Sequence, residues 1–302
     1  MCELLALSAN TPTDMRFSFH GLTRRGGVTG DHADGWGLAS FDPDGCGVRL
    51  YREDRPAAFS PIAAEVAALE LKAHCSIAHI RKATRGVIAL ENCHPFHRRW
   101  QGQEWIFAHN GDLEGSFELS AAFRPEGSTD SEASFCWLLQ QLESARTAGR
   151  LTPEDDRAIF DELVQGADAL ARRGIFNGLI SNGRWLFAYA GTKLHWLTRR
   201  APFRTATLAD DDLSVDFAQL ADPQDVVSII STEPLTTDES WSRLQVGEAV
   251  LLQRGEVLLH HLADIPVDPP AEPRAVDAAR TAASARLNAH RSANPPLPNP
   301  AA

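Results

Sequence analysis

Apolar runs alternate with polar turn segments over the first 265 residues, and this pattern predicts a chain rich in β-strands. Runs of about four to eight residues that are apolar or alternate in polarity, and that end at turn-forming residues, are typical of strands. Asn182-Gly183 lies between two such runs and predicts a two-residue hairpin turn. We expect strands at 2–8, 35–41, 48–52, 75–80, 105–108, 175–181, 184–189, 193–198, 225–231, 249–253 and 256–261.

Polar caps ahead of apolar-periodic stretches predict three helices. The segment 11–34 carries glycines and charges and is predicted as a long loop, a feature that is usually functional or partly disordered. Strands come first, two consecutive helices follow, and more strands complete the order, which favours antiparallel sheets with segregated helices. The helices are expected from Ser60-Pro61 to about Ala73, from the cap residues 128–132 to about Ala145, and from Thr152 to about Arg173.

Composition limits the classes of function. The formal net charge of -11 disfavours binding to nucleic acid or to an anionic membrane surface. No apolar stretch approaches the roughly 20 residues that span a bilayer, and the start does not resemble a signal peptide. Five scattered cysteines without a C-x-x-C pair argue against a disulfide framework and against a zinc site. We therefore expect a cytoplasmic protein that has no metal and needs no cofactor.

Proline usage sets the expected domain boundary. Eight of the 18 prolines fall between Pro266 and Pro300, together with many alanines. Such a composition is typical of a segment that cannot build its own packed core. We expect one domain over residues 1–265 and a flexible or peripherally docked tail over residues 266–302.

Cys2 is the first candidate for chemistry, because removal of Met1 would leave a thiol and a free α-amine on one residue. Met1 is expected to be removed because the next side chain is small. The amine, with a pKa near ~7.7–8.0, could then accept the proton of the thiol, whose pKa is near ~8.5. This arrangement is that of an N-terminal nucleophile. The alternative is a cysteine that only begins a buried strand.

Three further groups could act on a common substrate. Arg81 ends a buried strand and suits bidentate capture of a carboxylate, or it is a surface arginine with a buried stem. Asn110 and Gly111 could form an oxyanion hole, or an ordinary turn. Asp130 could bind an ammonium group, or serve only in helix capping. A substrate with one carboxylate, one ammonium and an acyl carbon would use all of them with Cys2, and glutamine is the simplest case.

Six segments in order resemble the class-II glutamine amidotransferases of the N-terminal-nucleophile hydrolase superfamily, and in particular the stand-alone bacterial members without a synthase domain. A late segment, Ser231-Thr232-Glu233-Pro234-Leu235 followed by Trp241, resembles a motif of that stand-alone group. The resemblance extends over about residues 2–262. The six segments are Met1-Cys2, 34–37 (DGWG), 79–84 (HIRKAT), 92–96 (NCHPF), 109–111 (HNG) and 128–132 (STDSE).

This resemblance implies an α+β fold, a four-layer αββα sandwich with two mainly antiparallel sheets between helix layers. It implies that Cys2 forms a γ-glutamyl thioester that water hydrolyses, with the α-amine as base. The implied roles are the glutamine carboxylate for Arg81, its ammonium for Asp130, the oxyanion for Asn110 and Gly111, and the pocket wall for Thr84 and His94.

Two departures leave the substrate open. Synthase-linked relatives commonly carry Trp after the Arg and His after the Thr, whereas this chain has Lys82 and Arg85. We therefore keep hydrolysis of a larger γ-glutamyl amide beside hydrolysis of glutamine, and a non-catalytic glutamine-binding module as an alternative of another class. No acceptor domain follows residue 265, so released ammonia would pass to a separate synthase.

Overall fold

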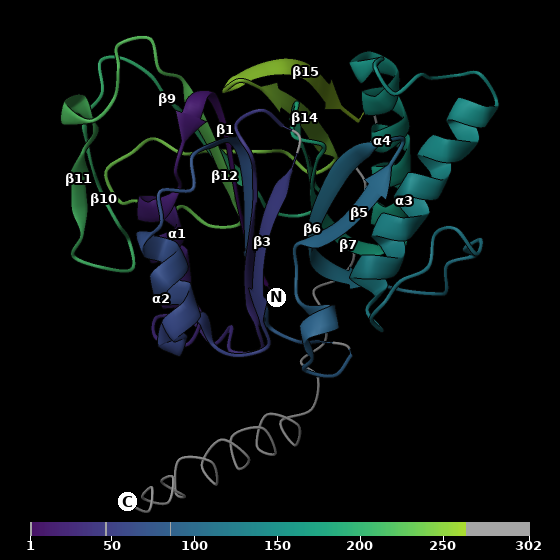
Figure 1. Ribbon diagram of the computed structural model, residues 1–302, viewed down its shortest axis with the longest axis horizontal. Coiled ribbons are helices and arrows are strands. Elements are labelled where there is room, and N and C mark those ends of the chain that lie inside the picture. Colours follow the sequence, from purple (N-terminus) through teal and green to yellow (C-terminus); the bar gives the residue numbers. More distant parts are fainter. Residues whose placement is uncertain (1, 46, 85, 264–302) are drawn as a thin grey trace, which may run out of the picture. The chain divides into compact units, whose positions relative to one another are not determined.

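The computed structural model describes residues 2–45, 47–84 and 86–263. These residues form two antiparallel sheets that pack face to face, and a pair of helices covers the outer side of each sheet (Figure 1). The layers are therefore helix, sheet, sheet, helix, and the predicted four-layer αββα sandwich is confirmed. The predicted boundary at residue 265 and the tail over 266–302 lie outside the described residues.

The first sheet has the strand order β13-β9-β12-β1-β4-β2-β3, and every neighbouring pair is antiparallel. β1 lies in its middle, where Leu4 pairs with His79 of β4 and Leu5 pairs with Ser231 of β12. The strand that follows Cys2 is thus held on both sides. The strands are β1 (Glu3–Thr13), β2 (Trp36–Phe41), β3 (Val48–Glu53), β4 (Ala73–Ile80), β9 (His195–Arg199), β12 (Val227–Ser231) and β13 (Ser242–Arg243).

The second sheet has the order β15-β14-β8-β7-β6-β5, again antiparallel throughout. A separate short hairpin is formed by β10 (Thr205–Thr207) and β11 (Ser214–Asp216). The strands of the second sheet are β5 (Phe96–Trp100), β6 (Gln103–Leu113), β7 (Gly174–Ser181), β8 (Leu186–Ala190), β14 (Glu248–Gln253) and β15 (Glu256–Leu262).

Four α-helices and three short 3₁₀ turns complete the described residues. Ser60 caps α2 through its side-chain oxygen, as the sequence predicts. Thr129 is the capping residue within the predicted cap residues 128–132, and Asp155 rather than Thr152 caps the fourth helix. The helices are α1 (Arg16–Arg25), α2 (Pro61–Ala68), α3 (Asp130–Thr147) and α4 (Asp156–Ala171), and the 3₁₀ turns are Ala57–Phe59, Leu90–Asn92 and Phe217–Gln219. None of the described helices combines the length and apolar composition needed to cross a bilayer.

Three apolar cores separate the layers. One lies between the first sheet and α1 with α2, one lies between the two sheets, and one lies between the second sheet and α3 with α4. Strand residues point alternately to opposite faces. Leu4 of β1 and Ala108 of β6 both lie in the core between the sheets. Cys2 and Asn110 have the same parity as these residues, so both face the space between the sheets.

Several predicted segments are wrong in kind or in extent. The helix predicted to about Ala73 ends at Ala68, and the strand predicted to end at Ser8 continues to Thr13. The segment 11–34, predicted as a long loop, contains α1, because Phe19 and Leu22 bury an apolar face against the first sheet. The strand predicted at 105–108 does not end at His109-Asn110-Gly111 but continues as β6 to Leu113. Asn110 and Gly111 pair with Asn177 and Phe176 of β7, so they are strand residues and not a turn.

Candidate active site

Cys2 lies half-buried immediately before β1, and the loop that follows β4 closes around its thiol. The backbone N–H of Lys82 donates to the Cys2 sulfur at 3.4 Å, and the Lys82 carbonyl oxygen lies 3.5 Å from the same atom. Burial raises the pKa of the Cys2 thiol, although the Lys82 N–H and the charge of Arg81 act in the opposite direction. The thiol is therefore protonated at neutral pH, and a base must take its proton before it can attack.

Asp34 fixes the loop that contacts the thiol. Its Oδ2 accepts a hydrogen bond from the backbone N–H of Ala83 at 2.8 Å. Its own N–H donates to the Arg81 carbonyl at 3.0 Å, and the Arg81 N–H donates to the Gly35 carbonyl at 2.7 Å. Asp34 and Gly35 thus hold residues 81–83 in place, and this fixes the position of the Lys82 N–H against the Cys2 sulfur.

Arg81 and Thr84 belong to this same loop. The Arg81 side chain is buried, and its Nη1 donates to the carbonyl of Val87 at 3.2 Å. The charge of this guanidinium acts on the Cys2 thiol, and it provides a fixed positive charge for an anionic part of a ligand. Thr84 lies further along the loop and is exposed. The structure therefore places Arg81 directly before the residue that contacts the thiol, whereas the binding role of Thr84 stays a prediction.

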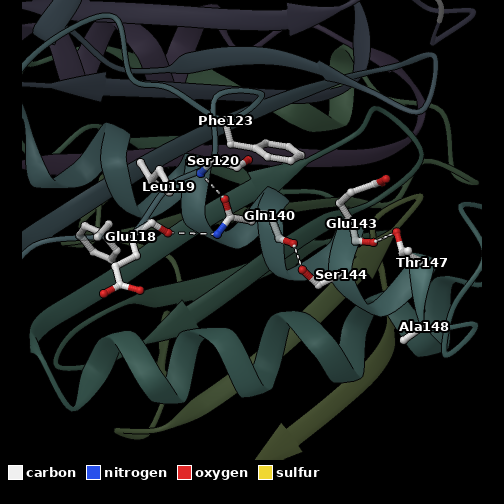
Figure 2. A pocket seen from close by; sticks show the side chains of 10 residues that line it. Glu118, Leu119, Ser120, Phe123, Gln140, Glu143, Ser144, Thr147 and Ala148 are labelled. Carbon is white, nitrogen blue, oxygen red and sulfur yellow. Dashed lines mark hydrogen bonds between the residues drawn. The ribbon is translucent and has the colours of Figure 1, made fainter.

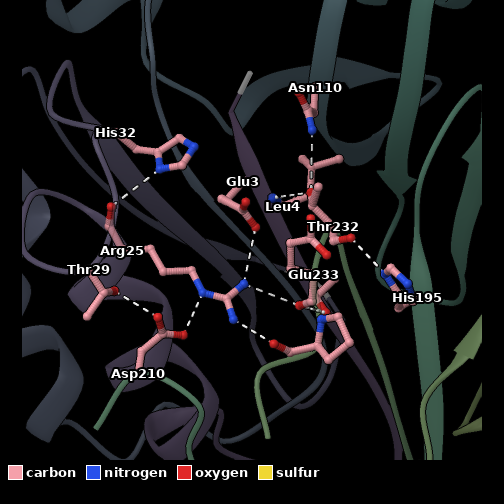
Figure 3. A network of polar contacts seen from close by, with 12 residues as sticks. Glu3, Leu4, Arg25, Thr29, His32, Asn110, His195, Asp210, Thr232 and Glu233 are labelled. Atoms are coloured by element: carbon pink, nitrogen blue, oxygen red, sulfur yellow. Dashed lines mark hydrogen bonds and ion pairs between the residues drawn. The ribbon is translucent and has the colours of Figure 1, made fainter.

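Asn110 is buried on β6, opposite the start of β1. Its Nδ2 lies 3.5 Å from Oγ1 of Thr232, and that oxygen accepts the backbone N–H of Leu4 at 2.9 Å. Figure 3 shows Asn110, Thr232 and Leu4 in one line of contacts from the second sheet to the first. One hydroxyl group thus joins the predicted oxyanion residue to the strand that begins at Cys2.

Gly111 cannot carry a side chain in this position. A Cβ atom there would lie 1.8 Å from the carbonyl oxygen of Ile175 on β7 and 2.7 Å from Nε2 of His109. Glycine in a strand interior commonly marks such a close approach of two backbones. The reason for Gly111 is therefore visible in the strand pairing itself.

Asp130 is the first residue of α3 and is half-buried. Thr129 caps the helix by accepting the N–H of Glu132 at 3.2 Å, so Asp130 is not the capping residue. Its Oδ2 accepts the N–H of Leu113 at 2.7 Å, which fixes the carboxylate at the end of β6. This bond holds the Asp130 carboxylate against Leu113, which lies two residues after Gly111 on β6.

His94 lies in a buried group of histidines. Its ring is 4.1 Å from the ring of His79 and 4.4 Å from that of Phe96, and its Nδ1 is 3.0 Å from Nε2 of His79. Burial is the main cause that holds the pKa values of His79 and His94 well below the usual range. Both rings are therefore neutral at physiological pH, and a pocket-lining role for His94 stays a prediction.

The comparisons with known proteins agree with this geometry. A sequence model of the class-II glutamine amidotransferases matches residues 1–275. The chain belongs to the class-II glutamine amidotransferases. It is 48% identical over 257 residues to "Putative glutamine amidotransferase YafJ" of Escherichia coli, a match that covers 85% of this chain and 99% of that protein. It is 44% identical to "Putative glutamine amidotransferase" of Haemophilus influenzae, with 85% of each chain covered.

Solved structures support the same family and fold. The crystal structure of a "predicted glutamine amidotransferase" from Pseudomonas aeruginosa is 41% identical, with a TM-score of 0.65 over 85% of this chain and all of that one. A glutamine phosphoribosylpyrophosphate amidotransferase of Bacillus subtilis is 14% identical, with a TM-score of 0.53 over 86% of this chain and 49% of that one. The second likeness concerns the fold alone. The predicted family and the N-terminal-nucleophile fold are confirmed.

Sequence reasoning missed a network that holds the start of this amidotransferase chain (Figure 3). Arg25 of α1 is buried, and its Nη1 lies 3.3 Å from Oε2 of Glu3 while its Nε lies 2.6 Å from Oδ2 of Asp210. The same guanidinium donates to the carbonyls of Glu233 and Pro234 at 3.3 and 2.5 Å. Glu3, the residue after Cys2, is thus connected through Arg25 to the late motif 231–235. The resemblance of that motif to stand-alone relatives is the signal in the sequence that could have pointed to this network.

The hollow in Figure 2 lies elsewhere. Its volume is about 1040 Å³, and it is formed by the segment 117–123 and by α3. The Gln140 amide holds the segment there, since it accepts from the N–H of Ser120 at 2.8 Å and donates to the carbonyl of Glu118 at 3.0 Å. None of the predicted site residues lines this hollow. Among the described residues, no group of three or more His, Cys, Asp or Glu side chains could hold a metal ion.

Proposed function

We propose that this class-II amidotransferase hydrolyses the side-chain amide of glutamine through a thioester on Cys2. The observation that carries the proposal is the meeting of three groups at one end of the two sheets. The Cys2 sulfur contacts the loop of Arg81 through Lys82, and Asn110 is joined to β1 through Thr232. Nucleophile, anion-binding group and oxyanion donor are what acyl transfer from a small amino acid amide requires.

The first half of the reaction forms the thioester. After Met1 is removed, the α-amine of Cys2 takes the thiol proton, and sulfur attacks the amide carbon. The carbonyl oxygen becomes an oxyanion, which the side-chain amide of Asn110 and the Gly111 segment of β6 stabilise. The ammonium form of the amine then returns the proton to the leaving nitrogen, so ammonia departs and the γ-glutamyl group stays on sulfur.

The second half releases glutamate. The same amine removes a proton from water, which attacks the thioester carbon, and the thiol of Cys2 is restored with that proton. The raised pKa of the thiol makes this base necessary, because an acidic cysteine would ionise without one.

Substrate binding is assigned to four residues. Arg81 pairs with the α-carboxylate, because its guanidinium is buried and its charge acts on the thiol. Asp130 pairs with the α-ammonium, because the Leu113 N–H fixes its carboxylate at the end of β6. Thr84 and His94 contribute to the wall of the pocket. The roles of all four are proposals.

Replacement of the thiol tests the mechanism. Cys2→Ala is expected to abolish the formation of glutamate from glutamine, measured with protein whose N-terminus is verified by intact mass. Cys136→Ala is the matched control, because it removes another buried thiol from α3 and leaves the site intact. Unchanged turnover in Cys2→Ala would refute the mechanism. Retained Met1 together with glutamine binding and no turnover would instead support the non-catalytic glutamine-binding module.

A larger γ-glutamyl amide is the second candidate substrate, and one observation favours it. Lys82 forms an ion pair with Asp31 at 2.5 Å, and this pair holds the loop around Cys2 to the segment that follows α1. Beyond it, the exposed side chains of Val87 and Ile88 offer an apolar surface next to Arg81. Initial rates with glutamine, asparagine, glutathione and other γ-glutamyl amides distinguish the two substrates. Much faster cleavage of free glutamine would exclude the larger amide.

The fate of the ammonia follows from the reaction. We propose that it passes to a separate synthase and that no cofactor takes part. The described cysteines Cys2, Cys75, Cys93 and Cys136 are free thiols, which suits the reducing conditions of a cytoplasm.

A further inference from the structure

We propose that Thr232 is a positioning residue for the oxyanion hole: its hydroxyl group selects the orientation of the Asn110 amide that presents Nδ2 to the developing oxyanion. This inference rests on the proposed amide hydrolysis. It concerns how the donor is kept ready, and it follows from the hydrogen bonds around one hydroxyl group.

The hydroxyl oxygen of Thr232 has a fixed place. The Thr232 N–H donates to the Leu4 carbonyl at 3.1 Å, and Nδ1 of His195 lies 2.8 Å from the Thr232 carbonyl. Oγ1 in turn accepts the Leu4 N–H at 2.9 Å. Backbone and side chain are thus tied to β1 two residues after Cys2, and Thr232 is almost fully buried. Any group that contacts Oγ1 is positioned relative to the nucleophile.

The Asn110 amide contacts this oxygen through its nitrogen, Nδ2, which leaves its own oxygen, Oδ1, without a donor in the described part of the chain. Nδ2 lies 3.5 Å from Oγ1, while Oδ1 is buried and has no hydrogen-bond partner among the described residues. A buried carbonyl oxygen without a donor is unfavourable in proteins, so the amide gains if it turns to give Oδ1 a donor. A half-turn of the amide about its bond to Cβ exchanges the two ends.

The turned amide satisfies both residues. Oγ1 already accepts from Leu4, so its own proton is available, and a hydroxyl group can donate one hydrogen bond while it accepts others. Thr232 then donates to Oδ1 of Asn110. The Nδ2 group then takes the place of Oδ1, which has no hydrogen-bond partner among the described residues, so its N–H bonds need an acceptor there. An oxyanion formed by attack of Cys2 supplies that acceptor.

Two substitutions test this role. Thr232→Val keeps the shape of the side chain but removes the hydroxyl group, and Thr232→Ser keeps the hydroxyl group. Removal of a whole oxyanion donor lowers kcat by about 10²–10³-fold, so loss of its orientation alone should lower kcat by about 10–50-fold in Thr232→Val. KM should stay within about twofold, because Arg81 and Asp130 are untouched, and Thr232→Ser should recover most of the rate.

Two measurements separate positioning from structural damage. In an Asn110→Ala background, Thr232→Val should cause no further loss of kcat, because the amide that it orients is gone. Alkylation of Cys2 by iodoacetamide needs no oxyanion donor, so its rate in Thr232→Val should equal that of the unsubstituted enzyme. Equal kcat in Thr232→Val and the unsubstituted enzyme, or additive losses in the double variant, would overturn the proposal.

A variant that does not fold and a protein without turnover each have a separate meaning for the proposal. If Thr232→Val does not fold, Thr232→Cys gives the same test by kcat alone, because a thiol still accepts weakly from Leu4 but is a poor donor to Asn110. An unsubstituted protein that turns over no amide would refute the proposed function itself, whereas an active protein with a fully active Thr232→Val would refute only the positioning role.

Discussion

His79 and His94 form a buried pair of neutral rings between the two sheets, so we expect the protein to lose stability as the pH falls below about 6.5. The perturbation is His79→Gln, which removes one ionisable ring and keeps a polar partner for Nδ1 of His94. Both rings are almost completely buried, His79 with 0% and His94 with 3% exposure, so a proton on either is strongly disfavoured.

The sign and the size of this pH effect on stability follow from the difference in proton binding between the folded and the unfolded state. Burial depresses the pKa of both histidines in the folded state, whereas the unfolded chain protonates them near the ordinary value of about 6.5. The stabilising difference is present above that pH and is lost as the pH falls below it. For each histidine, the free energy of unfolding then decreases by up to about 1.4 kcal/mol per pH unit. Two such histidines give up to about 3 kcal/mol per pH unit, a large share of the roughly 5–15 kcal/mol that stabilises a domain.

Urea unfolding from about pH 8 to about pH 5.5 measures this slope. His79→Gln should reduce the slope by up to about 1.4 kcal/mol per pH unit. Ile77→Val is the control, because it trims the same core between the sheets without removing a titrating group, and it should lower stability equally at every pH. An identical pH slope in His79→Gln and the unsubstituted protein would refute the assignment of neutral buried rings.

Two further substitutions test the supports of the site. Arg25→Met should destabilise the protein by about 3–5 kcal/mol in urea unfolding, because it leaves the carboxylates of Glu3 and Asp210 buried without their cation. Burial already raises the pKa of Glu3, so the loss should be smaller at acid pH, where Glu3 takes up a proton; an equal loss at every pH would contradict this. Gly111→Ala should cost about 1–3 kcal/mol of stability, because its Cβ would overlap the Ile175 carbonyl. Its kcat should fall at least tenfold if β6 shifts. An unchanged free energy of unfolding together with an unchanged kcat would contradict this expectation and show that β6 and β7 adjust to the added Cβ.

Local patterns in the sequence were enough for most elements of the fold. Asn182-Gly183 predicts the hairpin between β7 and β8, and both strands lie within two residues of the expected ranges. Ser60 and Thr129 predict the starts of α2 and α3, because a capping side chain satisfies backbone groups within its own turn. These signals depend on near neighbours in the chain, so tertiary structure does not overrule them.

Other elements depend on distant partners. α1 begins at Arg16 without a side-chain cap, and it contains Gly21, which weakens a helical pattern. The structure explains this glycine, since a Cβ atom there would lie 2.9 Å from the side chain of Leu208. β6 passes through Asn110-Gly111, a typical turn pair, because pairing with β7 satisfies its backbone. Packing and strand pairing outweigh local preference in both cases.

By itself, the sequence determined which residue types the site contains and in what order: a thiol at position 2, then Arg81, then Asn110-Gly111, then Asp130. It also determined the family, because ordered motifs survive in the linear chain. Only the tertiary structure decided which atoms meet: the Lys82 N–H at the Cys2 sulfur, the Asp34 carboxylate at the Ala83 N–H, and the Thr232 hydroxyl group between Asn110 and Leu4. Asn110 and Thr232 are separated by 122 positions in the chain. Their contact exists because the two sheets pack face to face, and no local pattern encodes that distance.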